Sequence, residues 1–231
     1  TPDVLAKSLH FVIDFDYNPY TPSKNIPKGK SKIKGIPDLP KGFEWTPEYF
    51  FHAQINLSEL AEINALNNLP KTGMLYFFLN PYDGEGMVHY HDVEIKDLEK
   101  AYPDCEFMGG DEREYNAFKN EEYEFGFKPG FIFNISEYED KVPEMLPKDI
   151  IESLKQLFNA PLKTNSAYSN MFGQPWFCQG EDELDADSDY THNNILLFQS
   201  EHGEANIHYQ IDRDDLKKLI FNEAFVTFST T

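Results

Sequence analysis

The chain has 231 residues, enough to bury a substantial core without disulfide bonds or a metal ion. Its 40 acidic and 20 basic residues give a formal net charge of -20, a field that repels phosphate backbones and anionic membrane surfaces. No apolar run approaches the ~20 residues that span a bilayer. We therefore expect no nucleic-acid partner and no membrane association. The chain opens without a secretion signal, and its two cysteines lie outside any CxxC spacing, so the expected location is cytoplasmic.

The first half of the chain predicts a sheet with one helical excursion. Apolar runs indicate strands over 9–15, 49–57, 74–79 and 87–91. Ser58 is a candidate cap for a helix that follows the second of these strands, and Pro70 and Gly73 end the excursion. The turn residues over 81–86 favour antiparallel pairing of the last two strands.

The second half predicts more strands and two further helices. Residues 92–124 are expected to form a loop with a short helix around 95–100, and the Lys128-Pro129-Gly130 turn predicts a hairpin over 123–135. The remaining expected elements are helices over 149–158 and 214–220 and strands over 195–199, 206–211 and 224–228. The pattern predicts an α+β fold, mainly antiparallel sheet with a few short helices, in a single domain over 1–231. A further hypothesis is that this domain consists of two similar halves.

Two motifs resemble ligand-binding loops without fulfilling their requirements. Gly29-Lys30-Ser31 matches the end of a phosphate-binding loop, but the leading glycine and the following helix are missing. The acidic run over 181–189 imitates the start of a calcium loop, yet Tyr190 stands where the turn glycine belongs. We expect this run to be a solvated acidic loop, with weak cation binding or contact with a basic partner as the alternatives.

No residues make a recognisable catalytic or metal-binding pattern. Neither cysteine has a nucleophile context, and no Gly-x-Ser-x-Gly elbow is present. His89 and His91 share one strand face and would need Asp92, His202 or His208 to complete a mixed metal site. Because histidines on strands more often pack or lie on the surface, no metal ligand, no catalytic residue and no cofactor is assigned.

Polar residues in apolar surroundings are the best candidates for ligand contacts. Buried amides need hydrogen-bond partners, so they either line a pocket or bridge the backbone within the fold, and the second use is the commoner one. The candidate ligand-binding residues are Gln54, Tyr76, Gln179, Gln199 and Glu204.

Several motifs spread along the chain carry a family resemblance. The segment Ser31–Pro40 matches a Ser-Lys-x-Gly-Gly-x-Pro-x-Leu-Pro pattern, and Ala53–Leu57 reads Ala-Gln-Ile-Asn-Leu. With these motifs the chain resembles the YwqG-like family of bacterial proteins, a domain of unknown function, over nearly its whole length. The resemblance implies the fold and no activity, and an association of some relatives with toxin systems makes an immunity role a hypothesis. Two departures are Lys34, in place of the first glycine of the pair, and 202–206, which lacks the Trp and Asp of the family's turn.

The charge and the missing catalytic motifs together favour a binding protein over an enzyme. We expect a non-catalytic module, with an immunity or antitoxin-type neutraliser as one form of it, whose acidic and aromatic-rich face engages a basic protein or peptide. The alternative is a hydrolase or a small-ligand sensor with a pocket near Gln54, Gln179 and Gln199.

Overall fold

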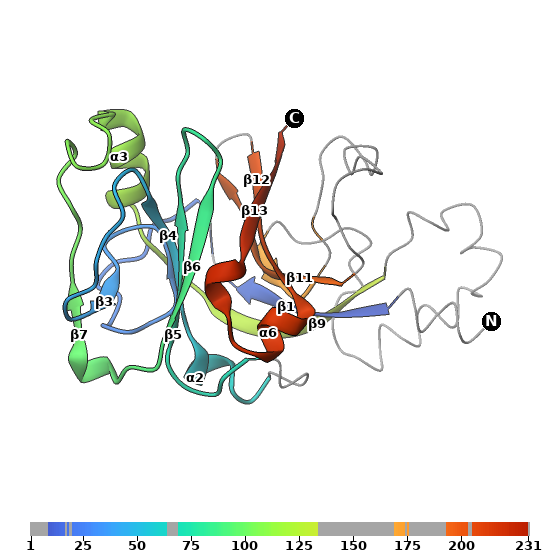
Figure 1. Ribbon diagram of the computed structural model, residues 1–231. Coiled ribbons are helices and arrows are strands. Elements are labelled where there is room, and N and C mark those ends of the chain that lie inside the picture. Colours follow the sequence, from blue (N-terminus) through green and yellow to red (C-terminus); the bar gives the residue numbers. More distant parts are fainter. Residues whose placement is uncertain are drawn as a thin grey trace. The chain divides into compact units, whose positions relative to one another are not determined.

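Figure 1 shows the computed structural model of the chain, which describes residues 9–16, 18, 20–63, 69–133, 169–173, 175, 193–202 and 205–230. The chain divides into two compact units. The first unit comprises Thr1–Phe15, Lys128–His208 and Phe228–Thr231, and the second comprises Asp16–Phe127 and Tyr209–Thr227. A single domain over 1–231, built from two similar halves, stays a prediction.

A five-stranded antiparallel sheet forms the centre of the second unit. Its strand order is β6-β5-β4-β2-β8. The strands are β2 (Lys32–Ile33), β4 (Phe50–Asn56), β5 (Met74–Leu79), β6 (Gly86–His91) and β8 (Tyr123–Glu124). Every residue of β4 and β5 is buried, because both strands lie inside the sheet and bury both faces. The strands predicted over 49–57, 74–79 and 87–91 are confirmed.

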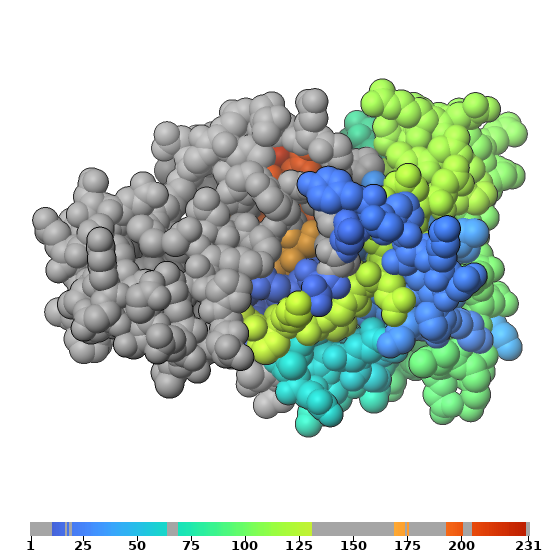
Figure 2. Space-filling view, turned by 180° about the vertical axis from the view of Figure 1, so that it is seen from behind, coloured from blue at the N-terminus to red at the C-terminus, as the bar shows by residue number. Residues whose placement is uncertain are grey.

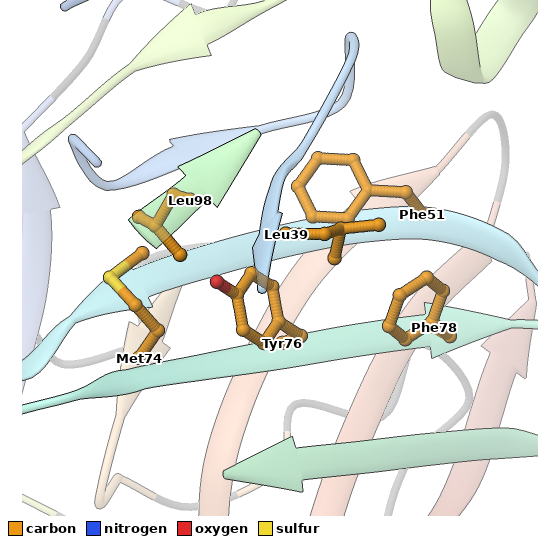
Figure 3. Close-up of a cluster of buried hydrophobic side chains, with 6 residues drawn as sticks. All are labelled: Leu39, Phe51, Met74, Tyr76, Phe78 and Leu98. Carbon is orange, nitrogen blue, oxygen red and sulfur yellow. The ribbon is translucent and has the colours of Figure 1, made fainter. Parts of the chain in front are cut away.

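One face of this sheet is covered by a short ribbon of β3 (Asp38–Pro40) and β7 (Leu98–Lys100). The two strands contribute Leu39 and Leu98 to a buried cluster on the sheet. Figure 3 shows these two side chains over the sheet residues Phe51, Met74, Tyr76 and Phe78. Partly buried side chains that include Phe43 and Trp45 extend the cluster outward. The Ser31–Pro40 motif therefore runs from the sheet onto its face.

Figure 2 shows the opposite side of the chain, where the blue segment after residue 20 lies against the yellow-green segment before residue 128. Backbone hydrogen bonds join the two segments, with the Ser23 amide donating to the Glu122 carbonyl oxygen at 2.8 Å. Strand β2 pairs with β8 at the same place.

A second, six-stranded sheet has the strand order β13-β12-β11-β10-β1-β9. The strands are β1 (Leu9–Asp16), β9 (Gly126–Phe133), β10 (Asn170–Met171), β11 (Asn194–His202), β12 (Ala205–Asp212) and β13 (Phe225–Thr230). Helix α6 (Arg213–Lys217) and the 3-10 turn η4 (Phe221–Glu223) connect the last two strands. The structure confirms the helix predicted over 214–220 and the strands predicted over 9–15, 195–199, 206–211 and 224–228.

The hairpin predicted over 123–135 is wrong. Strand β9 runs without a turn through Lys128-Pro129-Gly130, and β8 pairs with β2 instead. Among the described strands β9 is the edge strand of its sheet, and proline is tolerated on an edge strand because its missing amide costs no ladder hydrogen bond on the outer side. A side chain at Gly130 would meet Asp14 and Val12 at 3.1 and 3.2 Å, so this glycine allows a close approach to β1 and not a turn.

The loop predicted over 92–124 is also wrong in part. It contains the 3-10 turn η1 (Ile95–Asp97), strand β7 and helix α3 (Glu112–Lys119). Helix α3 is capped by the Asp111 side chain, which accepts hydrogen bonds from the backbone amides of Arg113 and Glu114. Its only buried residue is Phe118, so the apolar period that would have revealed the helix is missing.

The first helix starts two residues earlier than expected. In α2 (Leu57–Leu60) the cap is Asn56, whose side chain accepts from the Ser58 amide, so Ser58 lies inside the helix and does not cap it. The predicted helix over 149–158 lies outside the described residues. The fold is α+β with mainly antiparallel sheet and a few short helices, as predicted. None of the described helices has the length and apolar character needed to cross a bilayer.

Candidate functional site

Gln54 and Tyr76, two of the predicted ligand-binding residues, are cross-strand neighbours that meet at Asp38. The Gln54 side-chain oxygen accepts from the Asp38 amide at 2.8 Å, and its nitrogen donates to the Lys30 carbonyl oxygen at 2.7 Å and to Asp38 Oδ2 at 3.1 Å. The Tyr76 hydroxyl donates to the Asp38 carbonyl oxygen at 2.6 Å. Both side chains are fully buried and hold the segment between residues 30 and 38 on the sheet.

Asp38 is a site residue that sequence reasoning missed. It is fully buried, and its Oδ2 atom also accepts from the Gly29 amide at 3.0 Å. The other oxygen, Oδ1, has no hydrogen-bond partner among the described residues. Burial, together with the charge of Asp38, raises the pKa of Tyr76 far above its ordinary value. The available signal was an acidic residue between Pro37 and Leu39 in an otherwise apolar stretch.

The polar groups of Gly29-Lys30-Ser31 already bond to carboxylates of the protein itself. While Gly29 donates to Asp38, the Ser31 amide and hydroxyl donate to Glu59 Oε2 at 3.1 and 2.7 Å. The Lys30 ammonium pairs with the other Glu59 oxygen at 2.6 Å. A phosphate-binding loop needs free amides at these positions, so the segment does not act as one. Carboxylates from β3 and α2 take the place that a phosphate would have.

The lysine of the Ser31–Pro40 motif is also structural. Lys32 is fully buried, and its ammonium donates to the Ile36 carbonyl oxygen at 2.5 Å and to Glu122 Oε2 at 3.0 Å. Gly35 has a φ of 78°, and a side chain there would lie 2.5 Å from the Glu122 Cβ atom. Lys32 and Gly35 therefore fix the position of the motif against the segment that precedes β8.

Lys34, the departure from the family pattern, sits in a conformation suited to glycine. Its φ is 59°, in the left-handed region that is costly for residues with a Cβ atom. Its ammonium lies 5.9 Å from the centre of the Phe118 ring. Desolvation lowers the pKa of this amine, while the charges of Glu121 and Glu114 oppose the shift. Lysine thus occupies a backbone conformation that glycine adopts at lower cost.

An exposed aromatic residue in acidic surroundings lies elsewhere on the second unit. Tyr82 is 48% exposed, with its ring 6.1 Å from that of Phe50. Desolvation raises the pKa of the Tyr82 phenol, and four neighbouring groups raise it further: Asp111, Glu114, Cys105 and Glu48. These groups come from two stretches of the chain, Glu48 and residues 105–114, so the fold brings acidic residues that are distant in sequence close enough to influence one ring.

The turn before α3 completes this surface. Phe107 is 40% exposed, and its amide donates to the Asp104 side chain at 2.9 Å. Gly109 of the same turn faces the Tyr82 ring, since a side chain there would lie 3.2 Å from it. We define the acidic aromatic surface as Glu48, Tyr82, Asp104, Phe107, Asp111 and Glu114.

Strand β6 carries two partly exposed histidines on the cluster face. Their ring centres lie 6.3 Å apart, and Phe43 contacts both rings. Desolvation lowers the pKa of both imidazoles, and for His89 the charge of His91 lowers it further. Among the described residues no group of three or more histidine, cysteine or acidic side chains could hold a metal ion.

Of the other three predicted ligand-binding residues, the structure describes Gln199. Gln199 lies in β11 of the first unit, buried and opposite Asn170 of β10. Gln179 and Glu204 lie outside the described residues, as does the acidic run over 181–189. A shared pocket of these five residues therefore stays a prediction.

Comparison with known proteins supports a family and no activity. The family model described as "Domain of unknown function (DUF1963)" matches residues 31–229. The match begins at Ser31, the first residue of the Ser31–Pro40 motif. A comparison with curated proteins gives no significant match.

Proposed function

The chain belongs to this family of domains of unknown function, and on that premise we propose that it is a non-catalytic protein-binding module that engages a basic protein or peptide. The acidic aromatic surface is the proposed contact region. Neutralisation of a basic partner, as by an immunity or antitoxin-type protein, is the biological form of binding that this chemistry suits.

The observation that carries the proposal is the half-exposed Tyr82 ring, whose phenol has its pKa raised by the charges of three acidic residues, Asp111, Glu114 and Glu48. An arginine or lysine side chain that stacks on an aromatic face gains cation–π attraction, and nearby carboxylates add Coulomb attraction. The sequence between residues 104 and 124 has eight acidic and two basic residues, a formal net charge of -6 for a stretch that includes the turn before α3 and the helix itself. A basic partner would be both steered toward the surface and held on it.

A pocket near Gln54, Gln179 and Gln199 is less well supported as the functional site. The Gln54 amide uses its oxygen and both donors within the fold, and the residue is fully buried. A ligand that bound this amide would have to displace the Asp38 segment and leave buried groups unpaired, at a cost of about 1–3 kcal/mol for each group.

The test neutralises three carboxylates of the surface while keeping their shapes. The substitutions are Glu48→Gln, Asp111→Asn and Glu114→Gln, and asparagine preserves the cap of α3. Binding of a fluorescently labelled oligoarginine peptide to the full chain is measured by anisotropy at low and at moderate salt. At about 0.5 kcal/mol for each exposed charge, we expect the triple variant to bind about tenfold more weakly and with a smaller salt dependence.

A matched control separates a local surface from the overall field of the molecule. Glu94→Gln, Asp97→Asn and Glu99→Gln remove the same amount of charge from exposed positions around η1. This control is expected to keep most of the affinity. Equal losses in the two triple variants would show that the peptide only senses net charge, and the proposed surface would then be wrong.

A further inference from the structure

His89 and His91 are spaced to act together. They are two residues apart on β6, so their side chains leave the same face of the strand. The ring centres are 6.3 Å apart, and the ring planes are inclined by only 30°. Two imidazoles bound to one ion at about 2.0–2.1 Å place their ring centres roughly 4.5–5.5 Å apart, so the two rings need to approach each other by about 1 Å.

Aromatic neighbours hold both rings in place from the cluster side. The Phe43 ring lies 5.5 Å from the His89 ring and 5.8 Å from the His91 ring, in edge-on contacts. Phe78 contacts His89 at 5.7 Å, and Tyr76 contacts His91 at 5.9 Å. This packing limits the rotamers of the two histidines, so less conformational entropy is lost when a ligand binds them.

The ring nitrogens are available. Each histidine is partly exposed, and its interactions within the described part of the chain are ring contacts, with no hydrogen bond from either imidazole. Imidazole nitrogen is the commonest protein ligand of zinc, nickel and copper ions.

We propose that His89 and His91 form a two-ligand binding site for a divalent late transition-metal ion on β6. No third histidine, cysteine or acidic residue of the described chain joins them, so the other coordination positions are open to water or to a side chain of a binding partner. The formal net charge of -20 raises the local concentration of cations at the surface. The affinity is expected to increase from cobalt to nickel to copper, with zinc weaker than copper.

The test is calorimetric titration of the metal-free full chain with nickel chloride and with zinc chloride. His89→Gln and His91→Gln each leave one imidazole and abolish chelation, so each is expected to weaken binding about tenfold or more. His10→Gln removes a histidine of β1 that belongs to no candidate metal site and serves as the matched control, with unchanged affinity expected. Unchanged binding in both β6 variants, or an equal loss in the control, would overturn the proposal.

A measurement on the unmodified chain guards against variants that fail to fold. Substoichiometric nickel is added to the labelled protein, and line broadening is followed by nuclear magnetic resonance. We expect the strongest broadening at the His89 and His91 ring protons and at the amides of Val88 and Tyr90. Broadening centred on any other part of the chain would contradict the assignment.

Discussion

Replacing Lys34 tests the conclusion that this position demands a glycine-like backbone. Its φ of 59° costs a residue with a Cβ atom roughly 1–2 kcal/mol relative to glycine. Glycine loses about 0.4–1 kcal/mol of this stability advantage because it increases the conformational entropy of the unfolded chain. We therefore expect Lys34→Gly to be more stable than Lys34→Ala by about 0.5–1 kcal/mol.

The comparison with alanine removes the contribution of the lysine side chain. The Lys34 ammonium lies 5.9 Å from the centre of the Phe118 ring, a contact worth about 0.5–1 kcal/mol at a partly exposed site. Both variants lose this contact, so their difference reports the backbone alone. Lys30 is the matched control because its φ is not positive, and there glycine is expected to be less stable than alanine by about 0.4–1 kcal/mol.

The assay is urea unfolding followed by tryptophan fluorescence, with midpoints compared only between variants of equal slope. The reasoning predicts opposite signs at the two positions. If glycine is less stable than alanine at position 34 as well as at position 30, the left-handed conformation carries no measurable cost and our account of the motif is wrong.

Two further predictions concern other contacts of the second unit. A side chain at Gly86 would lie 2.1 Å from Val226 Cγ2, so Gly86→Ala should lower the free energy of unfolding by about 1–3 kcal/mol in thermal or urea unfolding. Adding Val226→Ala should restore part of that stability, and a double variant without any restored stability would contradict the clash. Desolvation and a hydrogen bond to Glu85 raise the pKa of Tyr49 to about 12 from an ordinary value of 10.0. Because the folded state favours the neutral phenol, the stability advantage over Tyr49→Phe should be constant below pH 10.0 and disappear as the pH rises toward 12. Unfolding midpoints of the two proteins that differ equally at neutral and at strongly alkaline pH would refute this.

The candidate site illustrates how far residue types alone can lead. Gln54 and Tyr76 were singled out as candidate ligand-binding residues, and the structure places them side by side and buried, while their role in binding stays a prediction. Their common partner Asp38 was not identified, because the contact depends on the Ser31–Pro40 motif turning back onto the sheet. The acidic aromatic surface was missed for the same reason, since Glu48, Tyr82 and Asp111 are distant in sequence.

Periodicity and turn residues alone determined most strands and the fold class. Strand β5 is apolar throughout, and β12 and α6 follow each other with clear signals, so local pattern was sufficient for them. Only the tertiary structure decided that β9 passes through Pro129, because β9 is the edge strand among the described strands of its sheet and an edge strand tolerates proline. It alone decided that α3 forms on a single buried residue and a side-chain cap, because the helix face is specified by what packs against it.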